Sequence, residues 1–284
     1  MTENDWQVRP MTQDEMSMAL QWAAAEGWNP GLQDGVAFHA ADPEGFLLGR
    51  YKGQPVGMVS AVRQGPYLGF MGFYIVRPAF RGHGWGWKLW QAGMARLSGR
   101  TIGLDGVVSQ QDNYRRCGFE LAWNNARFEG LRPEALPPAP PDLERLGPNQ
   151  VAQWLEFDAR HAGAGRGPFL RAWLAQPGTV ALGLSGFAGQ YAWGAIRPCQ
   201  QGFKVGPLMA DHPEHARQLL QALLAHLPAG ARYQLDVPLC HAEAVNLARA
   251  MGLEPVFETA RMYRGGMPAL RVDGIFGVTS FELG

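Results

Sequence analysis

The chain has 284 residues, no formal net charge and three cysteines. Its 25 basic residues balance its 25 acidic ones, and no basic run stands out; neither nucleic acid nor a membrane surface is favoured as a partner. The cysteines form no CxxC pair, so neither a disulfide framework nor a metal site is favoured. No apolar run approaches the roughly 20 residues that span a bilayer, and the N-terminus lacks a signal-peptide core. We expect a soluble, cytoplasmic protein of one large domain or two ordinary ones.

The chain begins with a predicted helix and a run of predicted strands. Residues 12–27 read as a helix in which Thr12 is the N-cap and Glu15 completes a capping box. Residues 45–76 read as successive strands separated by turns that contain glycine. The last of these strands is the apolar stretch 72–76.

The stretch VRPAFRGHGWGWKLW, residues 76–90, joins that strand to an apolar helix. It carries three glycines where the helix begins: Gly82, Gly84 and Gly86. A helix start has unpaired N–H groups and a positive dipole and binds anions, and glycine lets the backbone approach the anion closely. Arg81 adds a permanent cation. The stretch therefore predicts a pyrophosphate site, although it fits neither GxxxxGK[ST] nor GxGxxG, since Trp87 replaces the third glycine.

The two halves of the chain repeat one pattern. GFELAWNNARFEG, from Gly118, and GLEPVFETARMYRG, from Gly252, share Gly, Glu and an Ala-Arg pair at equal spacing. Each follows a strand that ends in Leu-Asp, at Asp105 and Asp236, and an apolar helix further upstream. The order strand, helix, strand, short helix, strand thus occurs twice, which predicts two copies of one α/β unit.

Two motifs of the first half resemble those of a known family. Arg81, Gly84 and Gly86 form Arg-x-x-Gly-x-Gly after a strand that ends Val-x-Pro, and residues 113–119, NYRRCGF, contain Tyr-x-x-x-Gly-Phe. In this order they resemble the GCN5-related N-acetyltransferase (GNAT) family. The tandem layout is similar to a subgroup with a degenerate GNAT-like C-terminal domain.

The resemblance implies two tandem GNAT-like domains, each an α/β (α+β) fold with a mixed, mostly antiparallel sheet flanked by helices. Five prolines between Pro133 and Pro141 predict an extended linker. The predicted division is an N-terminal domain with the acetyl-CoA site at 1–132, a linker at 133–141 and a degenerate domain at 142–284.

The second copy lacks the residues of the first motif. Registering the two helices places Asp211 and Glu214 opposite Arg81 and Gly84, and Ala248 stands where the first copy has its motif tyrosine. Carboxylates would repel a pyrophosphate, so we expect a single cofactor site, in the first half.

The resemblance also implies roles for individual residues. Acetyl-CoA would lie between two strands, and its pantetheine arm would pair with three backbone positions: Tyr74, Ile75 and Val76. The N–H of Val76 would polarise the thioester carbonyl. The loop and helix start would hold the pyrophosphate: Arg81, Gly82, His83, Gly84, Trp85, Gly86 and Trp87. Tyr114 would protonate the departing thiolate, and Asn113 would orient the pantetheine.

The acceptor side is less defined by the sequence. An acceptor amine must lose a proton to a base or a water chain, and the resemblance places Asp34 and His39 in a segment that often lines the acceptor pocket. A loop-capping role is an equal alternative for both. Asp105 ends a central strand near Tyr114 and is a third candidate. Its recurrence as Asp236 in the inactive copy favours a structural role.

These observations predict an acetyl-CoA-dependent N-acetyltransferase that acts on a primary amine of a small molecule by direct transfer in a ternary complex. The degenerate half would shape the pocket or form a homodimer. A non-catalytic acyl-CoA-binding module is the alternative from another class, and a protein lysine or N-terminal acetyltransferase is a second alternative. Tyr114, beside an intact Arg81 motif, favours the enzyme.

Overall fold

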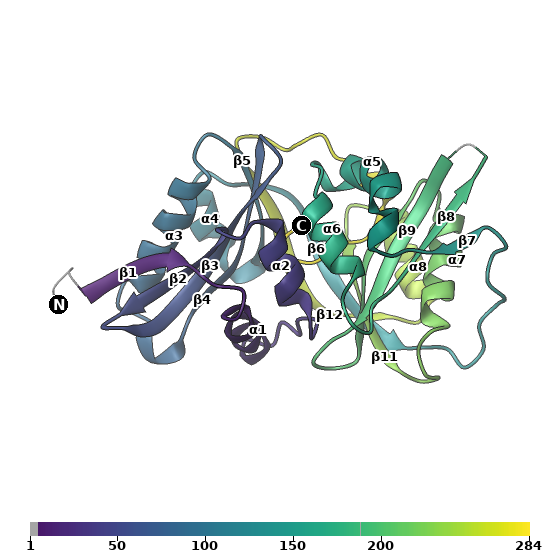
Figure 1. The fold of residues 1–284 in the computed structure, drawn as a ribbon, viewed down its shortest axis with the longest axis horizontal. Coiled ribbons are helices and arrows are strands. Elements are labelled where there is room, and N and C mark those ends of the chain that lie inside the picture. Colours follow the sequence, from purple (N-terminus) through teal and green to yellow (C-terminus); the bar gives the residue numbers. More distant parts are fainter. Residues whose placement is uncertain (1–4, 188) are drawn as a thin grey trace.

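A computed structural model describes residues 5–187 and 189–284. These residues form one sheet of 13 strands with helices on both faces, as Figure 1 shows. Most neighbouring strands are antiparallel, and two pairs are parallel. The predicted α/β class with a mixed, mostly antiparallel sheet is confirmed.

The first half contains these elements: β1 (Trp6–Pro10), α1 (Met16–Ala25), α2 (Asp34–Ala41), β2 (Phe46–Tyr51), β3 (Gln54–Gln64), β4 (Leu68–Val76), α3 (Trp85–Arg96), β5 (Thr101–Val107), α4 (Gln111–Arg116) and β6 (Glu120–Leu131). The second half contains these: β7 (Leu143–Arg145), α5 (Val151–Ala162), α6 (Gly167–Leu174), β8 (Val180–Gly186), β9 (Gly189–Pro198), β10 (Phe203–Ala210), α7 (Pro213–Leu224), β11 (Arg232–Pro238), α8 (Ala242–Ala250), β12 (Glu254–Arg264) and β13 (Ile275–Gly277). The predicted repeat is present as β4-α3-β5-α4-β6 and β10-α7-β11-α8-β12.

The first predicted helix is shorter than expected, but its capping box forms. The Thr12 N–H donates to Glu15 Oε2 at 2.9 Å, and the Glu15 N–H donates to Thr12 Oγ1 at 3.4 Å. The box closes a turn, and α1 begins at Met16. Hydrogen bonds from Arg9, with a smaller contribution from the Thr12 N–H, lower the pKa of Glu15 to about 2.

The last strand of each half lies in the other half's part of the sheet. β12 pairs with β5, where Arg261 faces Asp105, and β6 pairs with β11, where Arg127 faces Asp236. β6 and β12 also pair with each other at the centre of the sheet. Along the chain, the two repeats fall in the ranges 1–132 and 142–284. In the folded sheet, β6 of the first repeat pairs with β11 of the second, and β12 of the second repeat pairs with β5 of the first.

The hydrophobic core also links the two halves. One cluster contains residues of α1, α2, α5 and α6 and joins both halves on one face of the sheet. Within it the rings of Phe38 and Trp173 lie 6.1 Å apart, and those of Phe38 and Phe73 lie 5.6 Å apart. α3 and α7 cover separate clusters, one in each half. Within the part of the chain described, every helix is too short or too polar to span a bilayer.

Because β6 and β12 exchange places, we expect the two halves to stay associated after a cut in the proline-rich segment. A protease site inserted at 137–141, which is largely exposed, should allow one clean cut. The two fragments should then elute together from a gel-filtration column at the 31.1 kDa mass of the chain, because β6 stays between β11 and β12. Elution as two separate fragments without denaturant would contradict the exchanged arrangement.

Candidate active site

β4 and β5 run parallel and then diverge. They pair from Leu68 opposite Thr101 to Met71 opposite Leu104, and beyond this point a cavity of about 880 Å³ opens between them. Phe73 has a φ of 45°, a left-handed conformation that is rare for a bulky residue and that turns β4 away from its neighbour. Such a gap between strands leaves backbone groups without a sheet partner, so an extended ligand can pair with them.

The cavity brings together many of the predicted site residues. Eight line it: Tyr74, Ile75, Val76, Arg81, Trp87, Asp105, Asn113 and Tyr114. Seven others do not line it: Gly82, His83, Gly84, Trp85, Gly86, Asp34 and His39. The first five of these form the loop and the helix start beside the cavity, whereas Asp34 and His39 lie on α2.

The three glycines of the loop serve two different purposes. Gly82 and Gly84 have φ values of 78° and 80°, and Gly84 is the N-cap of α3. These left-handed conformations favour glycine, and a Cβ at either would meet no atom within 4 Å. At Gly86 a Cβ would lie 2.6 Å from the Tyr74 hydroxyl oxygen. Two glycines therefore shape the loop, and the third lets α3 pack closely on β4.

The loop presents donors that the protein does not use. In residues 5–187 and 189–284, no backbone N–H group from Gly82 to Trp87 donates to a protein acceptor. The Lys88 N–H is the next backbone donor along the chain, and it donates to Gly84 O at 3.3 Å. The Arg81 guanidinium donates to Val76 O at 2.8 Å and pairs with Glu26. Unpaired N–H groups at a helix start, beside an arginine, form an anion site.

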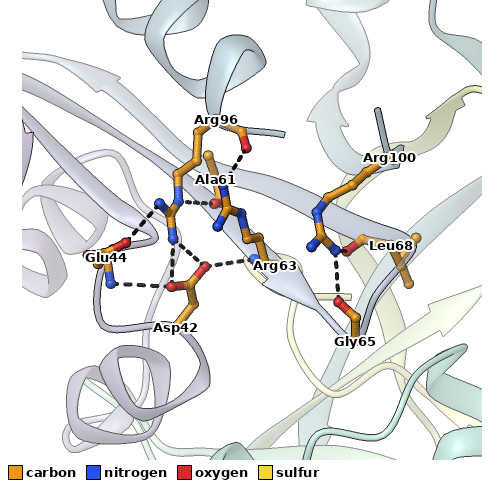
Figure 2. A network of polar contacts seen from close by, with 8 residues as sticks. All are labelled: Asp42, Glu44, Ala61, Arg63, Gly65, Leu68, Arg96 and Arg100. Atoms are coloured by element: carbon orange, nitrogen blue, oxygen red, sulfur yellow. Dashed lines mark hydrogen bonds and ion pairs between the residues drawn. The ribbon is translucent and has the colours of Figure 1, made fainter. Parts of the chain in front are cut away.

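A polar network fixes the far end of α3 (Figure 2). Arg96 donates to both carboxylate oxygens of Asp42, at 2.7 and 2.8 Å, and to Ala61 O at 3.1 Å. Asp42 also accepts from the Arg63 N–H at 2.9 Å. One guanidinium nitrogen makes both bonds to Asp42, and the pair is nearly buried. With the bond to Ala61 O, it fixes the last turn of α3 on β3 and on the residue that follows α2.

Tyr114 lies on α4 over the end of β5. Its ring stacks on Trp90, with centroids 5.6 Å apart, and a Cβ at Gly106 would overlap the ring. Burial, with the neighbouring Tyr74, raises the pKa of Tyr114 to about 12. The phenol therefore stays protonated at neutral pH and can donate a proton. Asn113 is exposed and donates to Gln110 Oε1 at 2.7 Å.

Two family profiles match the chain. The "Acetyltransferase (GNAT) family" matches residues 9–119 and the "Acetyltransferase (GNAT) domain" matches residues 154–277. The holothin acyltransferase of Pseudoalteromonas sp. (strain SANK 73390) is 30% identical over 279 residues, which cover 98% of this chain and 95% of that protein. The chain belongs to the GNAT family. It is a tandem GNAT N-acyltransferase, as the two motifs predicted.

Solved structures agree with this fold. A proposed acetyltransferase from Pyrococcus horikoshii superposes with a TM-score of 0.82 at 22% identity and covers 100% of this chain and 98% of its own. A tandem GNAT protein from the clavulanic acid biosynthesis pathway superposes with a TM-score of 0.64 at 17% identity, over 91% of this chain and 98% of its own. At these identities the likeness shows the fold.

In the second half of this GNAT, the chain's own backbone fills the corresponding gap between strands. β10 and β11 diverge as β4 and β5 do, but β13 fills the gap and pairs with β10 at Leu208 and Met209. The Val278 N–H donates to Asp236 O at 2.7 Å on the other side. At the start of α7, His212 caps the Glu214 N–H at 3.3 Å. Strand β13 was not predicted from the sequence.

The structure fits the loop-capping alternative for Asp34. Its carboxylate is buried, accepts from Arg197 at 2.7 and 3.0 Å, and accepts from the Gly31 N–H at 2.9 Å. Both carboxylate oxygens of Asp34 therefore accept hydrogen bonds outside the cavity, and the ion pair with Arg197 joins α2 to β9. His39 is half-buried and lies outside the cavity as well. Neither residue is in place to contact an acceptor.

Asp105 lines the cavity but is already paired. It accepts from Arg261 at 2.7 and 2.6 Å and from Asn125 at 2.8 Å. Asp236 and Arg127 form the equivalent pair in the second half, at 2.7 and 2.9 Å. Both pairs join strands from different halves, which supports the structural role for the two aspartates.

The sequence missed the residues that the second half contributes to the cavity. Four such residues line it: Phe257, Thr259, Phe281 and Glu282. The repeated Ala-Arg pair indicated that β6 and β12 are equivalent strands, but it could not predict that they exchange places in the sheet. Within the described residues, no group of three or more His, Cys, Asp or Glu is arranged to hold a metal.

Proposed function

We propose that this N-acyltransferase moves an acetyl group from acetyl-CoA to a primary amine of a small molecule, directly and in a ternary complex. One observation carries the proposal: one cavity has beside it a helix start whose backbone N–H groups have no acceptor among the described residues, and in its wall the largely buried, protonated phenol of Tyr114. The helix start suits a pyrophosphate, and the phenol can give its proton to a departing thiolate.

The residues present fit the cosubstrate. The free N–H groups from Gly82 to Trp87, with Arg81, would hold the pyrophosphate. The backbone of Tyr74 to Val76 would pair with the pantetheine arm at the diverging edge of β4. The amine nitrogen would attack the thioester carbonyl carbon, the carbon–sulfur bond would break, and Tyr114 would give its proton to the sulfur.

The cavity walls and the relatives support a small acceptor. Residues of both halves surround the space, including Phe257 and Phe281 from the second half. The name of the relative holothin acyltransferase gives holothin as its acceptor. A small amine fits such a walled cavity more readily than a protein segment does.

Thiol release from acetyl-CoA tests this function. A panel of small primary amines should contain acceptors that accelerate release well above the rate without amine. Binding of acetyl-CoA without turnover of any amine would favour the acyl-CoA-binding alternative. Faster transfer to lysine peptides than to every small amine would favour the protein acetyltransferase.

A further inference from the structure

The C-terminal tail runs from the blocked gap of the second half to the cavity of the first. After β13 it ends near the middle of the molecule, between the halves, as the C label in Figure 1 shows. Gln64 Nε2 donates to Leu283 O at 2.6 Å, and Arg166 donates to Gly284 O at 3.3 Å. These bonds and the burial of residues 278–283 hold the tail in one position.

Glu282 enters the wall of the cavity beside β4. A Cβ at Gly72 would overlap the Glu282 carbonyl oxygen, so this glycine makes room for the tail where β4 leaves β5. Glu282 is one of the residues that line the cavity. Tyr114 packs on Gly106 of β5, so Glu282 lies against one of the two strands that flank the gap and Tyr114 lies against the other.

Glu282 is the unpaired member of a buried cluster of charges. Arg127 is bound by Asp236, and Arg197 is bound by Asp34, which leaves Lys204 and Glu282. No ion pair joins Lys204 to Glu282 among the described residues, and the Lys204 ammonium donates to Asn29 O at 2.9 Å. In the part of the chain that the structure describes, no side chain donates a hydrogen bond to the Glu282 carboxylate, which interacts with its own backbone N–H. The carboxylate has further lone pairs that can accept a hydrogen bond from a ligand in the cavity.

The environment suits this carboxylate for proton transfer. Burial raises the pKa of Glu282, and Asp34 adds to the rise, while Lys204 and Arg127 oppose it. A carboxylate with a raised pKa is a stronger base toward an amine at neutral pH. The adjacent wall carries the rings of Phe257 and Phe281, 6.3 Å apart, and the Arg127 guanidinium lies over both rings.

We propose that Glu282 is the base that takes the proton from the acceptor amine, and that the acceptor's apolar body lies against Phe257 and Phe281. This inference rests on the proposed acetyl transfer. As the nitrogen lone pair forms the C–N bond, the N–H proton moves to a Glu282 carboxylate oxygen. The C–S electrons leave with the sulfur, which takes the Tyr114 proton. The acceptor class is therefore a primary amine on an apolar, ring-sized body.

The test compares wild type with Glu282→Gln, using 2-phenylethylamine and aniline as probes and measuring thiol release from acetyl-CoA across pH. Glu282→Gln should lower kcat/KM for the amine by about 100-fold or more. In the plot of kcat/KM against pH, the rise that accompanies deprotonation of the base should disappear. The Kd for acetyl-CoA should stay unchanged. Glu282→Asp should keep part of the activity and the rising limb.

Glu258→Gln is the matched control, because Glu258 is exposed on β12 between two cavity residues, Phe257 and Thr259. It should behave as wild type. An unchanged pH profile in Glu282→Gln, or lost acetyl-CoA binding in that variant, overturns the assignment. If Glu282→Gln fails to fold, a Glu282→Asp profile identical to wild type overturns it as well.

The wild type separates failure of this inference from failure of the proposed function. If it binds acetyl-CoA and acetylates amines with polar bodies but neither probe, the acceptor class inferred here is wrong. If it binds no acetyl-CoA, the proposed function itself is wrong, and the role of Glu282 falls with it.

Discussion

Asp236→Ala is expected to lower the free energy of unfolding by about 3–5 kcal/mol, because it leaves Arg127 as a buried, unpaired cation. The Arg127 and Asp236 side chains are 4% and 1% exposed, so water cannot replace the lost carboxylate. Trp28 O would still accept from Arg127, but a single carbonyl does not neutralise a guanidinium. The measurement is urea unfolding followed by tryptophan fluorescence.

A surface pair provides the control for this prediction. Glu214→Ala removes the partner of Arg217, where both side chains are nearly half exposed, and should change the free energy of unfolding by less than about 1 kcal/mol. The double variant Arg127→Met/Asp236→Leu should recover most of the loss, since a buried ion pair can be replaced by apolar side chains. Equal effects for Asp236→Ala and Glu214→Ala would contradict the account of the exchanged strands.

Tyr114→Phe is expected to lower kcat by about 100-fold or more, as for the loss of a general acid. The Kd for acetyl-CoA should stay unchanged, because the ring still stacks on Trp90 and packs on Gly106. In the wild type the pKa of Tyr114 is raised to about 12, so Tyr114 keeps its proton through neutral and mildly alkaline pH. Loss of kcat caused by its deprotonation should therefore begin only above about pH 10.

Steady-state thiol release and calorimetric titration of acetyl-CoA measure the two quantities separately. Tyr67→Phe is the control, since Tyr67 is exposed and lies outside the cavity. If Tyr114→Phe keeps the wild-type kcat, Tyr114 is a packing residue and the thiolate leaves without it.

Short sequence patterns predicted those features of the protein that depend only on residues close together in the sequence. The loop at Arg81 to Gly86 and the block at Tyr114 each fit into a few positions, so the sequence was enough to recognise the family, while the roles of these residues stay predictions. The two-copy order also followed from periodicity within each half. Gly86 was the exception in the loop, because its contact with Tyr74 depends on how α3 packs on β4.

Contacts between the halves could not be predicted in this way. Asp34 looked available for a substrate because its partner, Arg197, lies more than 160 residues away along the chain. Glu282 lies at the end of a tail without a motif, and only the three-dimensional path after β13 brings it to the cavity. The aspartates of the repeated Leu-Asp pairs were expected to be structural, and Arg127 and Arg261 give the physical reason.

We propose that the protein has a single acyl-CoA site, at the glycine loop of the first half. Calorimetric titration of acetyl-CoA into wild type and Gly84→Glu tests it most directly, since Glu214 occupies the corresponding position in the blocked half. Gly84 has a left-handed φ, so Gly84→Asn serves as a control for backbone strain, as asparagine tolerates that conformation without adding a negative charge. We expect one site in wild type, retained in Gly84→Asn and lost in Gly84→Glu. Two sites in wild type, or undiminished binding by Gly84→Glu, would contradict the account.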